Sequence, residues 1–262
     1  SFLAFNIDAV MIASPDQFHT KSLHAAISAK KHVFVEKPLI VYRSEIPLLS
    51  DALRSAKQQK LILTSCHPRR FDPPFIWFKT KKDDLERALG RPLHFNFDFS
   101  YHKASKEWKQ QCGLLMDHIS DEIDLINFIY GYTGFHITKI IDKPNYYHTI
   151  GRRDDGMTFS FIGTRLLDAR HYREMMIVRH EKGRVMVNTE NGTALIQNDE
   201  DGVIHIIPIP PTDYPQRFQK TTANFFLAIQ DKATNYLTTE DLWINSITAV
   251  YLNDGTEWTY TR

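Results

Sequence analysis

The stretch His32-Val33-Phe34-Val35-Glu36-Lys37-Pro38 decides the fold of this chain of 262 residues. Its first four residues are an apolar run of the length of a buried strand, and the proline ends the run. A residue before proline is biased to an extended backbone, so Lys37 is held at the carboxyl end of that strand. Open α/β sheets bind ligands at this end of their strands. Lys37 is therefore a candidate functional residue; a charged strand end before a turn is the alternative.

The segments on either side repeat the same pattern. An apolar run at residues 7–13 ends at Ser14-Pro15, an amphipathic helix is expected at 20–30, another at 44–58, and a third strand at 61–64. Strand and helix alternating with short connections predict a parallel sheet. Three strands make only half of a doubly wound dinucleotide-binding domain. We therefore expect an α/β fold in which residues 1–66 form the C-terminal part of a Rossmann domain.

Beyond residue 66 the pattern changes, and residues 67–262 are expected to form an α+β domain with an open antiparallel sheet. Two helices, ended by Gly90 and Gly131, and two later ones are expected together with seven strands. The expected helices are 74–89, 114–130, 214–230 and 239–252, and the expected strands are 93–101, 157–162, 175–179, 184–187, 194–197, 203–207 and 257–261.

Composition excludes several classes of function. The net charge of +1 does not favour nucleic acid or an anionic membrane as a partner. No apolar run approaches the roughly 18 residues of a membrane span. Cys66 and Cys112 have no metal or redox spacing, the histidines are scattered, and no metalloprotease, P-loop or nucleophile-elbow motif is present. We expect a cytoplasmic protein without a metal site.

The helix at 114–130 carries three acidic residues on one face. Asp117, Asp121 and Asp124 are spaced i, i+4 and i+7. Like charges at this spacing destabilise a helix by roughly 0.2–0.5 kcal/mol per pair. Two interpretations remain open: a solvated acidic face, or a face on which Asp117 and Asp121 point to a substrate.

The motifs together resemble the Gfo/Idh/MocA (glucose–fructose oxidoreductase/inositol dehydrogenase) family over nearly the whole chain. They are Ala13-Ser14-Pro15 with His19, the segment 32–39 around Lys37, Arg69-Arg70-Phe71-Asp72-Pro73, the stretch from Gly113 through Asp117 and 121–125 to Gly131, and the helix opening at 239–242. The resemblance implies hydride exchange between NAD or NADP and a CH–OH group of a sugar, cyclitol or related polyol. It also implies a homo-oligomer formed through the open sheet. Cofactor binding is implied for Ser14, Pro15, His19, Glu36 and Lys37, and Lys37 is also implied to touch the substrate.

Two features depart from the family pattern. The glycine-rich G-x-G-x-x-G loop and the acidic residue for the ribose are missing. They belong to a βαβ unit that would precede Ser1, so weak dinucleotide binding is expected, and the chain would lack the start of a full enzyme. Second, the family has an Asp followed four residues later by an acid/base His, whereas this chain has Asp117 and Asp121. Aspartate is a weak base at neutral pH, and we expect burial beside Asp117 to raise the pKa of Asp121.

The expected catalytic set is therefore Lys37, Asp117 and Asp121, with a neighbouring His as an alternative for the proton. His118 projects about 60° away from Asp121 around the helix, and His67 follows the third strand. His102 is a candidate for substrate binding, with an exposed loop histidine as the alternative. Arg70 would bind a substrate carboxylate or phosphate, with an interdomain salt bridge as the alternative. A non-catalytic sugar- or nucleotide-sensing regulator or scaffold is the rival function.

Overall fold

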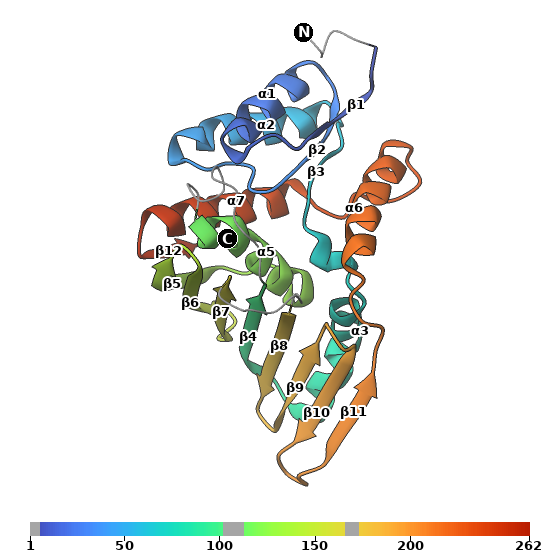
Figure 1. Ribbon diagram of the computed structural model, residues 1–262, viewed down its shortest axis with the longest axis vertical. Helices are drawn as coiled ribbons and strands as arrows, with labels where there is room; N and C mark the ends of the chain where they lie inside the picture. Colours follow the sequence, from blue (N-terminus) through green and yellow to red (C-terminus); the bar gives the residue numbers. More distant parts are fainter. Residues whose placement is uncertain (1–5, 102–112, 166–172) are drawn as a thin grey trace.

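The computed structural model describes residues 6–101, 113–165 and 173–262, which form two sheets and their covering helices (Figure 1). The smaller sheet is parallel and has the strand order β1-β2-β3. Its helices α1 and α2 pack against one another on one side of it. The elements of this part are β1 (Ala9–Ile12), α1 (His19–Ser28), β2 (His32–Val35), α2 (Ile46–Gln58) and β3 (Leu63–Ser65). The predicted partial Rossmann sheet is confirmed.

The larger sheet has nine strands in the order β11-β10-β9-β8-β4-β7-β6-β5-β12. Its neighbouring strands are antiparallel except for β4 and β7, which run parallel. The carboxyl ends of β4 and β7 therefore lie side by side. The strands are β4 (Pro92–Ser100), β5 (Phe135–Lys143), β6 (Tyr146–Arg153), β7 (Thr158–Thr164), β8 (Arg173–His180), β9 (Gly183–Asn188), β10 (Thr193–Asn198), β11 (Ile204–Pro208) and β12 (Glu257–Tyr260).

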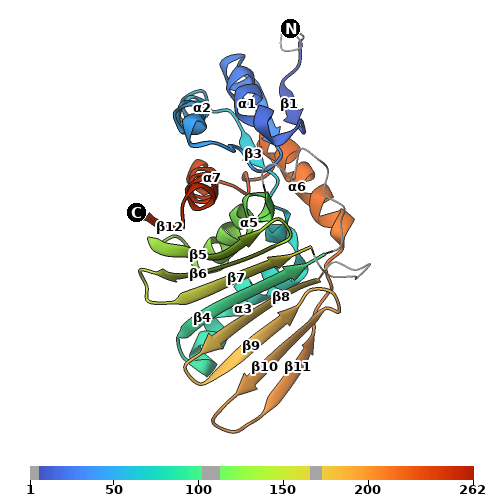
Figure 2. The same ribbon diagram turned by 60° about the vertical axis from the view of Figure 1, so that its left-hand side comes forward.

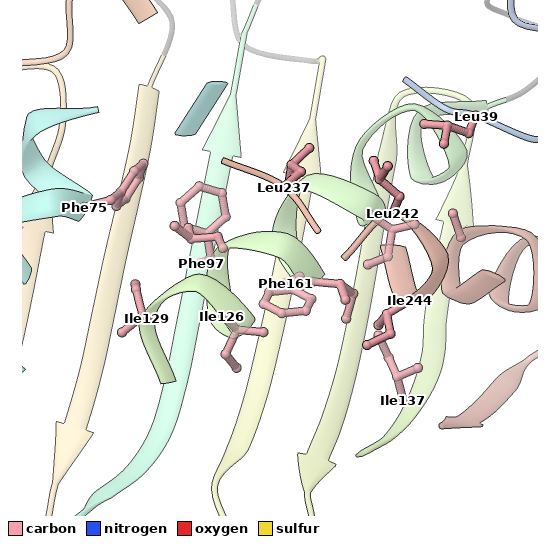
Figure 3. Close-up of a cluster of buried hydrophobic side chains, with 14 of the residues drawn as sticks. Leu39, Phe75, Phe97, Ile126, Ile129, Ile137, Phe161, Leu237, Leu242 and Ile244 are labelled. Carbon is pink, nitrogen blue, oxygen red and sulfur yellow. The ribbon is translucent and has the colours of Figure 1, made fainter. Parts of the chain in front are cut away.

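Helices cover one face of this sheet and leave the other open (Figure 2). The later helices are α3 (Pro73–Leu89), α5 (Gly113–Tyr130), α6 (Tyr214–Ile229) and α7 (Thr239–Asp254). In the core, Phe97 and Phe161 of the sheet lie against Ile126 of α5, and Leu242 of α7 packs beside them (Figure 3). Burying a side chain of this size contributes about 1.5–3 kcal/mol. Packing of α5 between the large sheet and α7 therefore fixes the helix that carries the acidic residues.

Most predicted elements lie within a few residues of their observed bounds, but β5 and β6 were not predicted. The register of β5 shifts between Lys139 and Ile141, which interrupts the alternation of apolar and polar side chains. Both strands also have half-exposed or exposed residues over much of their length. The second half of β5 is half-exposed or exposed on both faces, so it lacks the alternation that a strand with one buried face shows.

Over the described ranges, no helix is long and apolar enough to cross a bilayer. The boundary at residues 66 and 67 stays a prediction; it falls between the end of β3 and a 3₁₀ turn at Pro68–Phe71.

Candidate functional site

Three residues from distant parts of the chain meet where β2 ends. The Lys37 Nζ atom lies 3.1 Å from Asp117 Oδ1 and 3.3 Å from Asp121 Oδ2. It also donates a hydrogen bond to the backbone carbonyl of Asp117. Burial opposes the charged form of Lys37, but the two carboxylates outweigh it and raise the lysine pKa above its usual value. The structure thus brings together the three residues expected to be catalytic, as a fixed ammonium between two carboxylates.

The expected rise in the pKa of Asp121 is wrong in direction. Burial does favour the neutral acid, but Lys37, Arg69 and His67 favour the carboxylate more, and the pKa of Asp121 lies below its usual value. The interpretation of a solvated acidic face is also wrong, because Asp117, Asp121 and Asp124 are 4%, 7% and 1% exposed. Asp121 is therefore a buried, ionised carboxylate.

Asp117 also contacts Arg165 and His118. Its Oδ2 atom lies 3.2 Å from Arg165 Nη2 and 3.5 Å from His118 Nε2. Arg165 Nε donates to the Tyr101 hydroxyl at 2.9 Å, and that hydroxyl lies 3.1 Å from His118 Nε2. Burial, together with the charge of Lys37, holds the pKa of His118 well below its usual value, so this imidazole is neutral. His118 therefore contacts Asp117, on the side away from Asp121.

Tyr101 and Arg165 were not found by sequence reasoning. They follow Ser100 of β4 and Thr164 of β7, which are opposite one another in the parallel pair. Burial raises the pKa of the Tyr101 phenol. Both residues thus lie at the carboxyl ends of two parallel strands, beside Asp117, the partner of Lys37. They come together only because β4 pairs with β7, a strand about 60 residues later in the sequence.

His67 lies on the other side of Asp121. It lies two residues after the end of β3, and its side chain is 2% exposed. Its Nε2 atom is 4.0 Å from Asp121 Oδ1. Neither ring nitrogen of His67 has a hydrogen-bond partner, and neither does Asp121 Oδ1. Asp121 is therefore placed between Lys37 and His67.

The residues expected to bind cofactor gather at the same sheet edge. His19 is completely buried, and its ring nitrogens lie 2.7 Å from the carbonyl of Pro38 and 2.8 Å from the carbonyl of Ser14. His19 thus joins the loops that follow β1 and β2 through both ring nitrogens, and its contact with a cofactor stays a prediction. Pro15 precedes a short 3₁₀ turn. The Ser14 hydroxyl is buried and has no hydrogen-bond partner.

Glu36 lies next to Cys66 at the ends of β2 and β3. Burial raises the pKa of the Cys66 thiol well above its usual value, and the Glu36 carboxylate adds to this. Cys66 is a buried free thiol. An inert, protonated thiol is the expected state of a cysteine in such surroundings.

Arg70 is engaged by protein groups. It makes two hydrogen bonds to the Asp124 carboxylate, at 2.9 and 2.7 Å, and one to the Tyr236 carbonyl at 2.8 Å. It also forms an ion pair with Asp241, whose carboxylate accepts the backbone N–H of Thr238, the N-cap residue of α7. These contacts agree with the salt-bridge interpretation of Arg70, because its guanidinium group is engaged by Asp124, Asp241 and the Tyr236 carbonyl. His102, a candidate for substrate binding, lies outside the described residues.

A buried cluster of ion pairs lies beside the site, and Arg69 and Glu122 belong to it. Arg69 lies 3.1 Å from Glu122 and 2.8 Å from Glu174, and Arg217 lies 2.8 Å from Asp72 and 3.4 Å from Glu174. Burial raises the pKa of Asp72 to about 7 and that of Glu122 to about 7. Three carboxylates against two guanidinium groups favour one bound proton in this cluster.

Among the described residues, no group of three or more His, Cys, Asp or Glu side chains is arranged to hold a metal ion. The charged centre of the site is the Lys37 ammonium.

Known proteins share both the sequence and the fold. Residues 3–66 match the family model GFO_IDH_MocA, described as an oxidoreductase family with an NAD-binding Rossmann fold. The myo-inositol 2-dehydrogenase of Thermotoga maritima is 34% identical over 215 residues, which are 75% of this chain and 61% of that protein. The uncharacterized oxidoreductase YrbE of Bacillus subtilis is 30% identical over 138 residues, 53% of this chain and 39% of that protein. The chain thus spans less than two thirds of the length of these relatives.

Solved structures show the same fold at low identity. An oxidoreductase domain protein from Kribbella flavida aligns with a TM-score of 0.82 and 15% identity, covering 99% of this chain and 82% of that one. Levoglucosan dehydrogenase in complex with NADH and levoglucosan aligns with a TM-score of 0.77 and 16% identity, with the same coverages of 99% and 82%. With the family match and the sequence relatives, these likenesses lead to one assignment: the chain belongs to the Gfo/Idh/MocA oxidoreductase family.

Proposed function

We propose that this protein acts as an NAD(P)-dependent oxidoreductase on a CH–OH group of a sugar, cyclitol or related polyol. The observation that carries the proposal is the Lys37 ammonium, fixed by Asp117 and Asp121 at the carboxyl end of a parallel strand. That end of an open α/β sheet is where ligands bind. Relatives named as inositol dehydrogenases support the substrate class, and they do not favour the non-catalytic alternative.

Lys37 is the residue proposed to bind the reacting oxygen. Two of its N–H groups bond to Asp117, which leaves one to be shared between Asp121 and a substrate oxygen. The ammonium is held in place before substrate arrives, so it stabilises negative charge on that oxygen without reorganising. Asp117 is itself held by Arg165, which keeps the lysine aimed.

The residues of this chain fit one side of a nicotinamide cofactor. Ser14 follows β1 and Glu36 follows β2, and the buried Ser14 hydroxyl has no partner within the protein. We propose that Ser14, Pro15 and Glu36 border the nicotinamide, which supplies hydride exchange when bound. His19 keeps their two loops together. The NAD-binding description of the family supports NAD(H); the choice between NAD and NADP is open to titration.

The open face of the large sheet is the proposed surface for homo-oligomer formation. Ile177, Met186, Leu195 and Ile206 are directly opposite one another on four adjacent strands, so they form one row on one face. Ile206 is 69% exposed. We expect Ile206→Glu to lower the apparent mass in light scattering, and an unchanged mass would exclude this face. The free thiol of Cys66 is consistent with the cytoplasm, which we propose as the location.

Titration of the protein with NADH and with NADPH, followed by nicotinamide fluorescence, tests the cofactor part of the proposal. Because the glycine-rich loop is missing from this sequence, weak but saturable binding is expected for one of the two. Glu36→Gln and Ser14→Ala are expected to weaken it, while the exposed control Lys57→Met is expected to leave it unchanged. No binding of either cofactor at millimolar concentration would contradict the proposal.

A further inference from the structure

His67 differs from the other buried histidines of the described part of the chain. His19 has carbonyl oxygens at both ring nitrogens, and the Nε2 atom of His118 has the Tyr101 hydroxyl. His180 bonds to the Gly90 carbonyl through Nδ1. His67 alone in this set has no hydrogen bond at either nitrogen, although its side chain is 2% exposed. Nothing fixes its tautomer, so either nitrogen is able to carry the proton.

The unbonded Nε2 atom of His67 faces an unbonded carboxylate oxygen. Asp121 Oδ1 lies 4.0 Å away and has no hydrogen-bond partner, while Asp121 Oδ2 is engaged by Lys37 at 3.3 Å. Buried polar atoms without partners are rare, and each requires an explanation. A small movement closes the gap to hydrogen-bond distance, which makes the two side chains natural partners in a transfer.

The other groups of the site are poor places for a proton. Lys37 is already protonated because its pKa is raised. Asp117 is surrounded by Lys37, Arg165 and His118. His118 resists protonation because burial and the charge of Lys37 lower its pKa. Asp121 is ionised, and a proton that reaches it needs a better acceptor behind it.

We propose that Asp121 and His67 form one proton-transfer pair, in which Asp121 touches the substrate and His67 stores the proton. This inference rests on the proposed oxidoreductase function. It assigns the imidazole of the reaction to the segment after β3, whereas the helix position that bears it in the family pattern carries Asp121. His67 acts through Asp121 and is a positioning residue.

The step balances as follows in the direction of alcohol oxidation. The C–H hydride goes to the oxidised nicotinamide, the hydroxyl proton goes to the Asp121 carboxylate, and the carbonyl forms. Rotation of the carboxylic acid turns the proton toward His67, whose Nε2 lone pair accepts it. Asp121 is then a carboxylate again, paired with an imidazolium; reduction of a ketone runs the same steps backward.

Few charged groups surround His67. On α5 they are Asp121 and Asp124, whose carboxylates both interact with the imidazole. From the segment before α7, the Tyr236 hydroxyl accepts the backbone N–H of His67 at 3.2 Å. These contacts place two carboxylates and one hydroxyl beside His67.

The pair is tested first without turnover, by ¹⁵N NMR of the histidine rings in the full chain. Asp121→Asn is expected to move both ring nitrogen resonances of His67 and to leave those of His180 in place. The exposed control Asp51→Asn is expected to move neither. His67 resonances that do not respond to Asp121→Asn would overturn the pairing.

Turnover then tests the transfer. His67→Gln is expected to lower kcat by about 10²-fold, the lower end for a proton-transfer group, with KM and NADH affinity unchanged. A solvent isotope effect larger than that of the wild type is expected. The double variant with Asp121→Asn is expected to cost no more than the larger single change, because the two act as a unit. His180→Gln is the buried-histidine control and is expected to keep wild-type kcat.

Each remaining outcome decides the inference. Wild-type kcat in His67→Gln overturns the role of His67 while the proposed function stands. If His67→Gln does not fold, the solvent isotope effect and kcat of Asp121→Asn, in which His67 is intact, are measured instead, and an unchanged kcat overturns the pair. A wild type without turnover on any polyol removes the proposed function and the transfer with it, whatever the NMR result.

Discussion

Replacing Arg70 by methionine separates its two interpretations. The guanidinium joins α5 and α7 through Asp124 and Asp241, and the side chains are 10%, 1% and 1% exposed. Removing one partner from a buried ion pair leaves the other charge uncompensated, which costs about 3–5 kcal/mol. For a chain of this size, 1 kcal/mol corresponds to about 2–4 °C in Tm, so a decrease of about 6–20 °C is expected.

The assay is urea unfolding at neutral pH followed by far-UV circular dichroism, with thermal melts in parallel. Arg54→Met is the matched control, because Arg54 pairs with Asp51 at 2.6 Å on the surface with 67% of its side chain exposed. Exposed pairs contribute about 0–1 kcal/mol. A loss in Arg70→Met no larger than that of the control would refute the structural role. It would return Arg70 to the candidates for substrate binding.

Two further predictions concern stability. Burial raises the pKa of Asp72 and Glu122 to about 7, so the folded state holds a proton that the unfolded state releases near pH 4. The free energy of unfolding of the wild type, relative to that of Glu122→Gln, should therefore fall by about 1.4 kcal/mol per pH unit between pH 5 and 7. The titration of histidines cancels in this difference. A difference in urea midpoints that does not change with pH would contradict the prediction. Gly163→Ala should cost about 1–3 kcal/mol, because a Cβ there would lie 2.4 Å from Tyr147. Gly255→Ala, whose nearest contact would be 3.3 Å, should cost less in the same thermal melts, and equal losses would refute the packing argument.

The parallel half of the fold follows from the sequence because β2 and β3 are largely buried and β1 is partly buried. The apolar runs at 9–13, 32–35 and 61–63 are therefore continuous, and each is followed by a polar residue. Lys37 was found by the same reasoning, because its place at a strand end is a local property. β5 and β6 were missed because the register of β5 shifts and both strands have half-exposed or exposed residues over much of their length.

The rest of the site depends on long-range pairing and on charge. Tyr101 and Arg165 meet only because β4 and β7 run parallel, which no local pattern indicates. The spacing of Asp117 and Asp121 predicted a shared face correctly. The pKa of Asp121 was predicted in the wrong direction because the nearby cations come from other segments: Lys37 follows β2 and Arg69 follows β3.

The most direct test of the proposed function is the rate of NADH or NADPH formation with a panel of cyclitols and sugars, compared between the wild type and Lys37→Met. The account predicts saturable turnover with at least one polyol, and a decrease of about 10²-fold or more in kcat/KM for Lys37→Met, because the fixed ammonium stabilises the transition state. Lys57→Met should retain wild-type turnover. Turnover that survives in Lys37→Met, or its absence from the wild type with every polyol, would contradict the account.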